Sequence, residues 1–231
     1  MNVKISNSWD NVLKEFPSEK KDIYYSEGYV RLYEGDESKA LCIICQEGKN
    51  VLLMPFLRNR IRDFFDFETA YGYGGPIVNT ESREWTDRAL AEMCSCFKSE
   101  KYICGFIRFH PLLRNNTYCQ KGICVIPDRH TVVMDLSVEE EEIWKTQISS
   151  KNRNMIRKAE KLGLKYLAEY DFASINEFAI LYKETMDRLG ADGFYYFDEG
   201  YYREYIREMS GRGFLGTVRL DGKLLGAALF M

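Results

Sequence analysis

The stretch that most constrains the fold spans residues 144–165, WKTQISSKNRNMIRKAEKLGLK. Its apolar residues recur at helical spacing and define one face: Ile148, Met155, Ile156, Ala159 and Leu162. The stretch holds seven Lys or Arg and a single acidic residue, Glu160, although the chain carries a net charge of −3. One side of this predicted helix is therefore suited to packing and the other to binding anions. An ordinary solvated helix face is the alternative interpretation.

Length and composition narrow the class of protein. A chain of 231 residues that is 45% hydrophobic can form one large domain or two small ones. It has no apolar run long enough to span a membrane and no signal-peptide core, and its seven cysteines suit reduced, buried thiols. We therefore expect a cytoplasmic protein. The presence of only two histidines argues against a histidine-based metal site.

The first part of the chain has a mixed α/β pattern. Asn7 or Ser8 is a candidate cap for a short helix that stops at Pro17. The expected strands are an antiparallel meander of 29–33, 40–45 and 50–58, followed by buried strands at 103–109 and 125–136. A helix is expected over 82–98. The glycines and proline of 67–78, FETAYGYGGPIV, exclude an ordinary helix there.

A second unit is expected from Ser137, a candidate N-cap ahead of an acidic first turn. After the basic helix we expect a strand over 165–170, a helix over 174–189 ended by Gly190, and a Tyr-rich helix. The last two strands, 213–220 and 223–231, flank the hairpin signal Asp221-Gly222. A sheet of three strands would leave an apolar edge exposed. We therefore expect either a truncated chain or an edge covered by a partner or by the first domain.

Four stretches resemble the FemA/FemB/FemX family of peptidoglycan bridge-forming aminoacyltransferases. They are AYGYGGPIV (70–78), IRFHPL (107–112), SSKNRNMIRKAEKLGLK (149–165) and LYKETMDRLGADGFYYF (181–197). The basic helix is the most specific of the four. The resemblance implies an α/β (α+β) fold of tandem GNAT-like, or acyl-CoA N-acyltransferase-like, domains. We place a first domain at 1–136 and the N-terminal part of an incomplete second domain at 137–231.

The resemblance also implies an enzyme, an acyltransferase that moves an aminoacyl group from charged tRNA to an amine of a UDP- or lipid-linked muropeptide. No cofactor is indicated with certainty: aminoacyl-tRNA is the donor co-substrate, or acetyl-CoA in the alternative. The anionic muropeptide or nucleotide sugar suits the basic helix, where Lys151, Arg153, Asn154 and Arg157 are candidate substrate-binding residues. The sequence does not indicate a catalytic residue, and nothing selects Asp187 or Asp192 as a general base.

Aromatic and basic residues elsewhere extend the candidate set. Tyr71 and Tyr73 on the glycine-rich loop, with Tyr195 and Tyr196 after Gly190, could stack a uracil or contact a peptide stem. Packing between the two domains is the alternative for these tyrosines. Arg108 and Arg188 are candidate anion contacts, although Arg188 also fits a plain helix-end charge. His110, before Pro111, more often serves as a structural hydrogen-bonding residue than as a base.

Two other functions stay open on the sequence. One is a GNAT-like N-acyltransferase that uses acyl-CoA on a sugar nucleotide or surface polysaccharide precursor. The glycine-rich pyrophosphate loop of such enzymes is not evident, because GRGFLG (211–216) precedes a strand and has the pattern of a turn. The other is a non-catalytic binding module or fragment. The sequence does not indicate the oligomeric state.

Overall fold

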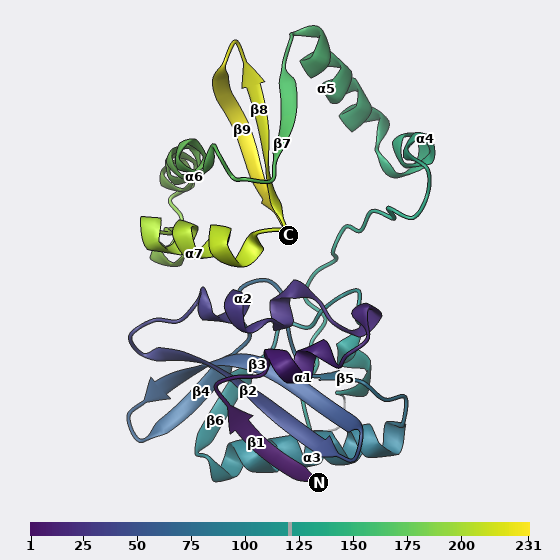
Figure 1. The fold of residues 1–231 in the computed structure, drawn as a ribbon, viewed down its shortest axis with the longest axis vertical. Helices are drawn as coiled ribbons and strands as arrows, with labels where there is room; N and C mark the ends of the chain where they lie inside the picture. Colours follow the sequence, from purple (N-terminus) through teal and green to yellow (C-terminus); the bar gives the residue numbers. More distant parts are fainter. Residues whose placement is uncertain (120–121) are drawn as a thin grey trace. The chain divides into compact units, whose positions relative to one another are not determined.

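The computed structural model describes residues 1–119 and 122–231, which form two compact units, Met1–Arg129 and His130–Met231. Both units combine helices with β-sheets, so the α+β class is confirmed (Figure 1). The tandem GNAT-like architecture remains a prediction. The division at 129/130 lies seven residues before the boundary expected at 136/137.

The first unit is built on one mixed sheet. Its strands run in the order β1-β2-β3-β4-β6, with β5 paired to β3, and every pairing is antiparallel except that of β4 with β6. The strands are β1 (Asn2–Ser6), β2 (Ser38–Glu47), β3 (Asn50–Ile61), β4 (Phe64–Glu68), β5 (Ile77–Val78) and β6 (Tyr102–Phe106). The helices are α1 (Asp10–Lys14), α2 (Glu27–Arg31) and α3 (Arg83–Ser99), with short 3-10 turns at Ser18–Lys20, Ile23–Tyr25 and Asn115–Tyr118.

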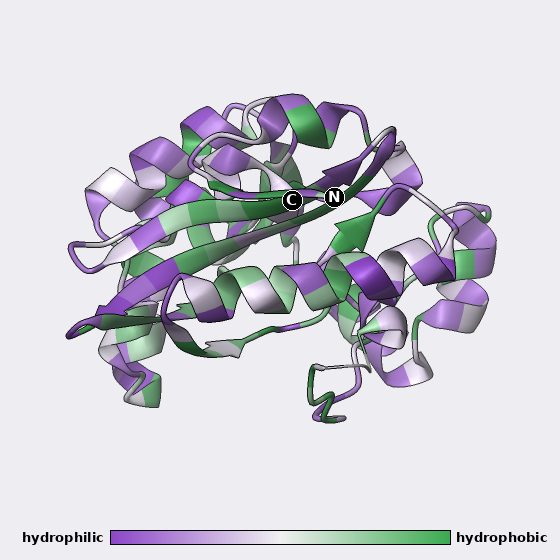
Figure 2. Ribbon diagram, turned by 90° about the horizontal axis from the view of Figure 1, so that it is seen from below, coloured by the Kyte–Doolittle hydropathy of each residue, from purple (hydrophilic) through white to green (hydrophobic). Residues whose placement is uncertain are grey.

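Both faces of the central strands are buried. β3 is buried from Val51 to Leu57 without interruption, which is the pattern of a strand covered on both sides. On one side, Leu52, Met54 and Phe56 pack with the apolar face of α3. Figure 2 shows long hydrophobic stretches along the strands and mixed hydropathy along the helices. The core of this unit therefore lies on the central hairpin β2–β3.

Three of the strands predicted for this unit differ from the structure. Residues 29–33 belong largely to α2 and not to a strand, because Ser26 caps a helix there by accepting from the Tyr29 amide. β6 ends at Phe106, and both Ile103 and Phe106 are exposed, so a fully buried strand over 103–109 is wrong. The expected strand over 125–136 has no strand pairing at all. A strand needs a neighbouring backbone, which the local apolar pattern cannot supply.

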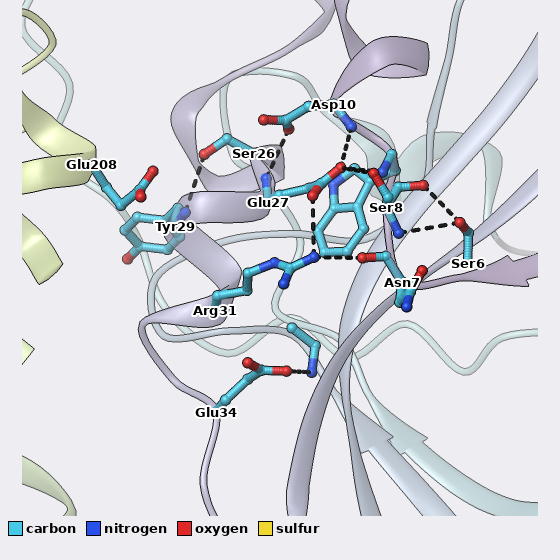
Figure 3. Close-up of polar contacts among 12 residues, drawn as sticks. Ser6, Asn7, Ser8, Asp10, Ser26, Glu27, Tyr29, Arg31, Glu34 and Glu208 are labelled. Carbon is cyan, nitrogen blue, oxygen red and sulfur yellow. Dashed lines mark hydrogen bonds and ion pairs between the residues drawn. The ribbon is translucent and has the colours of Figure 1, made fainter.

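The first two helices cap each other. Neither Asn7 nor Ser8 is the side-chain cap expected for α1; instead the Glu27 carboxylate of α2 accepts from the backbone amides of Trp9 and Asp10 (Figure 3). In return, Asp10 Oδ1 accepts from the Glu27 amide at 2.8 Å, and Arg31 Nη2 lies 3.2 Å from Glu27 Oε2. Carboxylates at helix N-termini satisfy orphan N–H groups and the helix dipole. This reciprocal pair holds α1 against α2.

Glu27→Gln tests this arrangement through its pH dependence. Burial alone raises the pKa of Glu27, but the hydrogen bonds from the Asp10 and Trp9 amides, the Ser8 hydroxyl and Arg31 outweigh it and leave the pKa below its usual value. A depressed pKa stabilises the fold above the unfolded-state pKa, and this contribution is lost as the pH falls through the folded-state pKa. We expect wild type to be more stable than Glu27→Gln by about 1 kcal/mol at pH 7, typical of an N-cap.

The measurement is urea denaturation between pH 7 and pH 3. The stability difference between wild type and Glu27→Gln should shrink below the usual glutamate pKa of 4.5. Glu15→Gln makes the same charge change at an exposed position and serves as the control. A difference that stays constant over this pH range would contradict the role assigned to the Glu27 charge.

The second unit has a three-stranded antiparallel sheet in the order β7-β8-β9. Its elements are α4 (Glu140–Glu142), a π-helical turn (Ile143–Gln147), α5 (Ser150–Lys161), β7 (Lys165–Glu169), α6 (Ile175–Leu189), a 3-10 turn (Gly193–Tyr195), α7 (Glu199–Met209), β8 (Phe214–Leu220) and β9 (Lys223–Phe230). As predicted, Asp221 and Gly222 turn the last hairpin at positive φ, and Gly190 ends α6 at φ 59°. The turn expected over 211–216 forms only before Phe214, because β8 begins there and includes Gly216.

A small core joins α6, α7 and β8 and contains Phe178, Tyr202, Tyr205, Met209 and Leu215. Two expectations for this unit are wrong. Ser137 does not cap α4, because its hydroxyl and amide are both bonded to Asp135 Oδ1. The helical spacing of apolar residues over 174–189 predicts that Leu189 is buried, but it is 67% exposed, since it lies in the last turn before Gly190.

Candidate functional site

The glycine-rich loop of the first unit is fixed by backbone contacts to the segment after β6. Gly74 donates its amide to the Arg108 carbonyl at 2.7 Å, and Thr69 accepts from the Arg108 amide through its hydroxyl at 3.0 Å. Gly75 has φ 90°, and a Cβ there would lie 2.9 Å from Asn115 Nδ2. Glycine is therefore required by both backbone conformation and space.

This anchoring brings three of the predicted site residues together. The Arg108 guanidinium lies 5.9 Å from the ring centroid of Tyr71, and its Nη1 donates to the Gly72 carbonyl at 3.5 Å. The Tyr73 ring contacts the rings of Tyr24 and His110, at centroid distances of 5.5 and 5.4 Å. Arg108 and Tyr71 are exposed, so a cation and an aromatic face are both presented to solvent.

His110 has the structural role that the sequence favoured. Its side chain is buried, Nδ1 accepts from the Leu113 amide at 3.2 Å, and Nε2 lies 3.4 Å from Asp22 Oδ2. Both ring nitrogens are thus engaged within the fold. A general base needs a nitrogen within reach of a substrate proton, so this histidine is poorly placed for that task.

Other residues that support this loop were not identified from the sequence. Tyr24 and Tyr29 pack edge to face at 5.1 Å, and the Tyr29 hydroxyl donates to the Tyr71 carbonyl at 2.7 Å. Burial, followed by the nearby Asp22 carboxylate, raises the pKa of Tyr24 above its usual value. This phenol therefore stays protonated near neutral pH. Its only sequence signal was the IYY run at 23–25, which carries no motif.

In the second unit, the start of α5 determines what its arginines do. Ser149 caps the helix by accepting from the Asn152 amide at 3.3 Å. The Nη1 atom of Arg153 donates to three carbonyls of the preceding turn, those of Trp144, Lys145 and Ile148. These carbonyls lie at the end of a helical turn, where cations are stabilising. Arg153, which was predicted to bind phosphate, thus stabilises the turn that precedes α5.

The other predicted residues of α5 are exposed. Arg157 lies over the Trp144 ring at 5.4 Å, and the side chains of Lys151 and Asn154 face solvent. At about 100° per residue, these three and Lys158 fall within an arc of about 120° on the helix. The apolar face, which begins beside this arc, does not pack as expected in the described residues, since Met155 is 60% and Leu162 61% exposed.

The remaining candidates lie at the end of α6 and after it. Arg188 lines a hollow of about 450 Å³ between α6 and β9, together with Tyr182 and Leu225. Tyr195 packs edge to face on Phe194 at 5.4 Å, while the Tyr196 hydroxyl is bonded to Asp187. Arg188 therefore lines the α6–β9 hollow, whereas Tyr196 is bonded to a carboxylate of α6.

Asp187 is poorly suited to be the general base. Its Oδ2 lies 2.9 Å from Lys183 Nζ, and the hydrogen bonds from Lys183 and Tyr196 lower its pKa below the usual range. A carboxylate with a depressed pKa has a weak affinity for protons near neutral pH. Within residues 1–119 and 122–231, no cluster of three or more His, Cys, Asp or Glu side chains could hold a metal ion. None of the helices in the same residues is long and apolar enough to cross a membrane.

Comparison with known proteins supports the resemblance found in the sequence. The FemAB family model matches residues 119–212, and a search of curated proteins gave no match. The match supports the FemAB-like assignment and, with it, a transferase. The matched segment contains α4, α5, β7, α6 and α7, and with them Lys151, Arg157 and Arg188. The cluster of Tyr71, Tyr73 and Arg108 lies before it.

Proposed function

We propose that this protein transfers an aminoacyl group from a charged tRNA to an amine of a UDP- or lipid-linked muropeptide. The observation that carries the proposal is the FemAB match over residues 119–212, which contains the whole basic helix α5. The exposed cations of that helix suit the pyrophosphate that such an acceptor carries. Arginine can bind phosphate oxygens in a bidentate manner, whereas lysine acts as a point charge.

The cluster in the first unit suits a different part of the acceptor. Tyr71 offers an exposed ring beside the Arg108 guanidinium. A planar uracil can stack on such a ring, and a carboxylate of a peptide stem can pair with the arginine. We assign these two residues to substrate binding. The Tyr73 ring of the same loop is held by its contacts with Tyr24 and His110.

The transfer is direct in this proposal. The acceptor amine forms a bond to the aminoacyl carbonyl carbon, the ester C–O bond breaks, and the ribose oxygen of the tRNA leaves with a proton from the amine. Because the ester is already activated, orientation and stabilisation of the oxyanion can supply much of the acceleration. Burial raises the pKa of the thiols of Cys42, Cys45 and Cys119, which disfavours a cysteine nucleophile at these positions.

A thermal-shift assay with three ligands tests the proposal. UDP-linked muropeptide, charged tRNA and acetyl-CoA are each added at about 100 times the expected dissociation constant, where a bound ligand stabilises by about 2.7 kcal/mol, a shift of several degrees. We expect shifts with the muropeptide and with charged tRNA. A shift with acetyl-CoA alone would instead identify an acyl-CoA-dependent N-acyltransferase. Binding of the muropeptide without any transfer in the presence of charged tRNA would identify a binding module.

A further inference from the structure

A second basic surface lies in the first unit, away from the tyrosine loop. A hollow of about 710 Å³ opens at the end of the β3–β4 hairpin. Its lining includes five basic side chains, which we call the hairpin cations: Lys39, Arg58, Arg60, Arg62 and Lys101. Nothing in the proposed transfer reaction uses these residues.

The sheet register places the hairpin cations in a row. Lys39 on β2 is directly opposite Arg58 on β3, so the two like charges share one face. Arg60 lies two residues further along β3 on the same face, about 6.6 Å away along the strand. The Arg58 guanidinium lies 4.7 Å from the centroid of the Phe65 ring. Like charges directly opposite each other destabilise a sheet, which a bound anion would relieve.

The hairpin cations outnumber the carboxylates that share their hollow. Asp36, Glu37 and Asp63 line the same hollow, yet among the described residues none of the hairpin cations makes an ion pair. By contrast, Arg31, Arg83 and Arg88 of the same unit are all paired with carboxylates. The hairpin cations therefore remain available to an anion from outside the protein.

We propose that the hairpin cations bind the phosphodiester backbone of a nucleic acid. A single phosphate is held best by donors that converge on one point, such as a helix N-terminus or a nest. Here the cations are instead spread along a strand and across to its neighbour, which suits a polymer that presents phosphates at intervals.

This inference deepens the proposed function, since it rests on a nucleic-acid donor and gives that donor a second point of contact. The donor's reactive end is not involved. The contact is sequence-independent, so it should extend to any single strand and weaken steeply with salt.

The test is fluorescence anisotropy with a labelled 12-nucleotide RNA, its DNA counterpart and phosphatidylglycerol vesicles. The variant Lys39→Gln/Arg60→Gln changes two exposed side chains, and Lys49→Gln/Lys98→Gln removes the same charge at exposed positions outside the hollow. We expect the first variant to bind RNA roughly tenfold more weakly at low salt and to reduce the salt slope by about 1.4, and the second to resemble wild type. DNA of the same sequence should respond in the same way.

An equal loss of RNA affinity in both variants would indicate a general charge effect and would overturn the proposed site. Failure of the wild-type protein to bind RNA at low salt would overturn it as well. Vesicle binding that depends on the hollow, without RNA binding, would overturn the nucleic-acid assignment in favour of lipid. The muropeptide thermal shift separates this inference from the proposed function. A thermal shift with the muropeptide but no RNA binding contradicts only the nucleic-acid site in the hollow. RNA binding without a thermal shift from the muropeptide contradicts only the assigned acceptor.

Discussion

Asn115→Ala should lower the stability of the first unit by about 3–4 kcal/mol, because a fully buried amide would be removed from four partners. Asn115 Nδ2 donates to the carbonyl of Gly74 at 2.7 Å, the hydroxyl of Tyr25 at 3.1 Å and the carbonyl of Pro76 at 3.3 Å. Its Oδ1 accepts from the His110 amide at 2.9 Å. Alanine would leave buried polar groups without these bonds.

The measurement is thermal and urea denaturation, where we expect a fall in Tm of about 10 °C. Asn116→Ala makes the same substitution one residue along the same 3-10 turn, outside this network, and should change stability by less than about 1 kcal/mol. Tyr25→Phe, which removes a single hydroxyl from the network, should fall between the two. If Asn115→Ala and Asn116→Ala are equally stable, the amide does not anchor the loop.

The Asn115 network also explains why the loop of the candidate site was only partly predictable. The glycines of 67–78 excluded a helix, and Tyr71 and Tyr73 were identified as unusual on such a loop. Their partners were not identified, because Tyr24, Tyr29 and Asn115 are distant in sequence and form no motif. Contacts of this kind depend on the tertiary fold, which composition and periodicity do not describe.

Elements were predictable where the signal was local and long. A helix was expected over 82–98 from its amphipathic pattern, and α3 forms over Arg83–Ser99. The Asp221-Gly222 hairpin was equally clear from its turn residues. The strand predicted over 29–33 was wrong because the apolar residues of this short run fit the period of a helix as well as that of a strand. The Ser26 cap and the Glu27–Asp10 pair, which favour the helix, lie outside the run.

The basic helix shows the same division within one element. Its position and its cationic face followed from the sequence, and the FemAB match covers it, but its Ser149 cap was not predicted. The role of Arg153 did not, because the turn at 143–147 that supplies its carbonyl partners has no local signature. A row of cations on a helical wheel therefore does not distinguish the residues that hold the fold from those that face a ligand.

Lys151→Gln/Arg157→Gln should weaken binding of UDP-linked muropeptide by about 2–4 kcal/mol, or roughly 30- to 800-fold in Kd, if each side chain loses a charge-assisted bond to phosphate. Both side chains are exposed, so stability should change little. Isothermal titration calorimetry measures the affinity. Lys165→Gln/Lys223→Gln, two exposed lysines elsewhere in the second unit, is the charge-matched control and should retain wild-type affinity.

Arg153→Gln separates structural from binding cations on the same helix. Because its Nη1 is bonded to the carbonyls of Trp144, Lys145 and Ile148, we expect a loss of about 1–3 kcal/mol in stability. The affinity of the folded variant for the muropeptide should change less than that of Lys151→Gln/Arg157→Gln. If Arg153→Gln instead loses affinity at unchanged stability, Arg153 is the phosphate ligand and the carbonyl contacts are secondary. Unchanged affinity in Lys151→Gln/Arg157→Gln would identify this part of α5 as a solvated helix face, and the acceptor would then have to be bound by other residues.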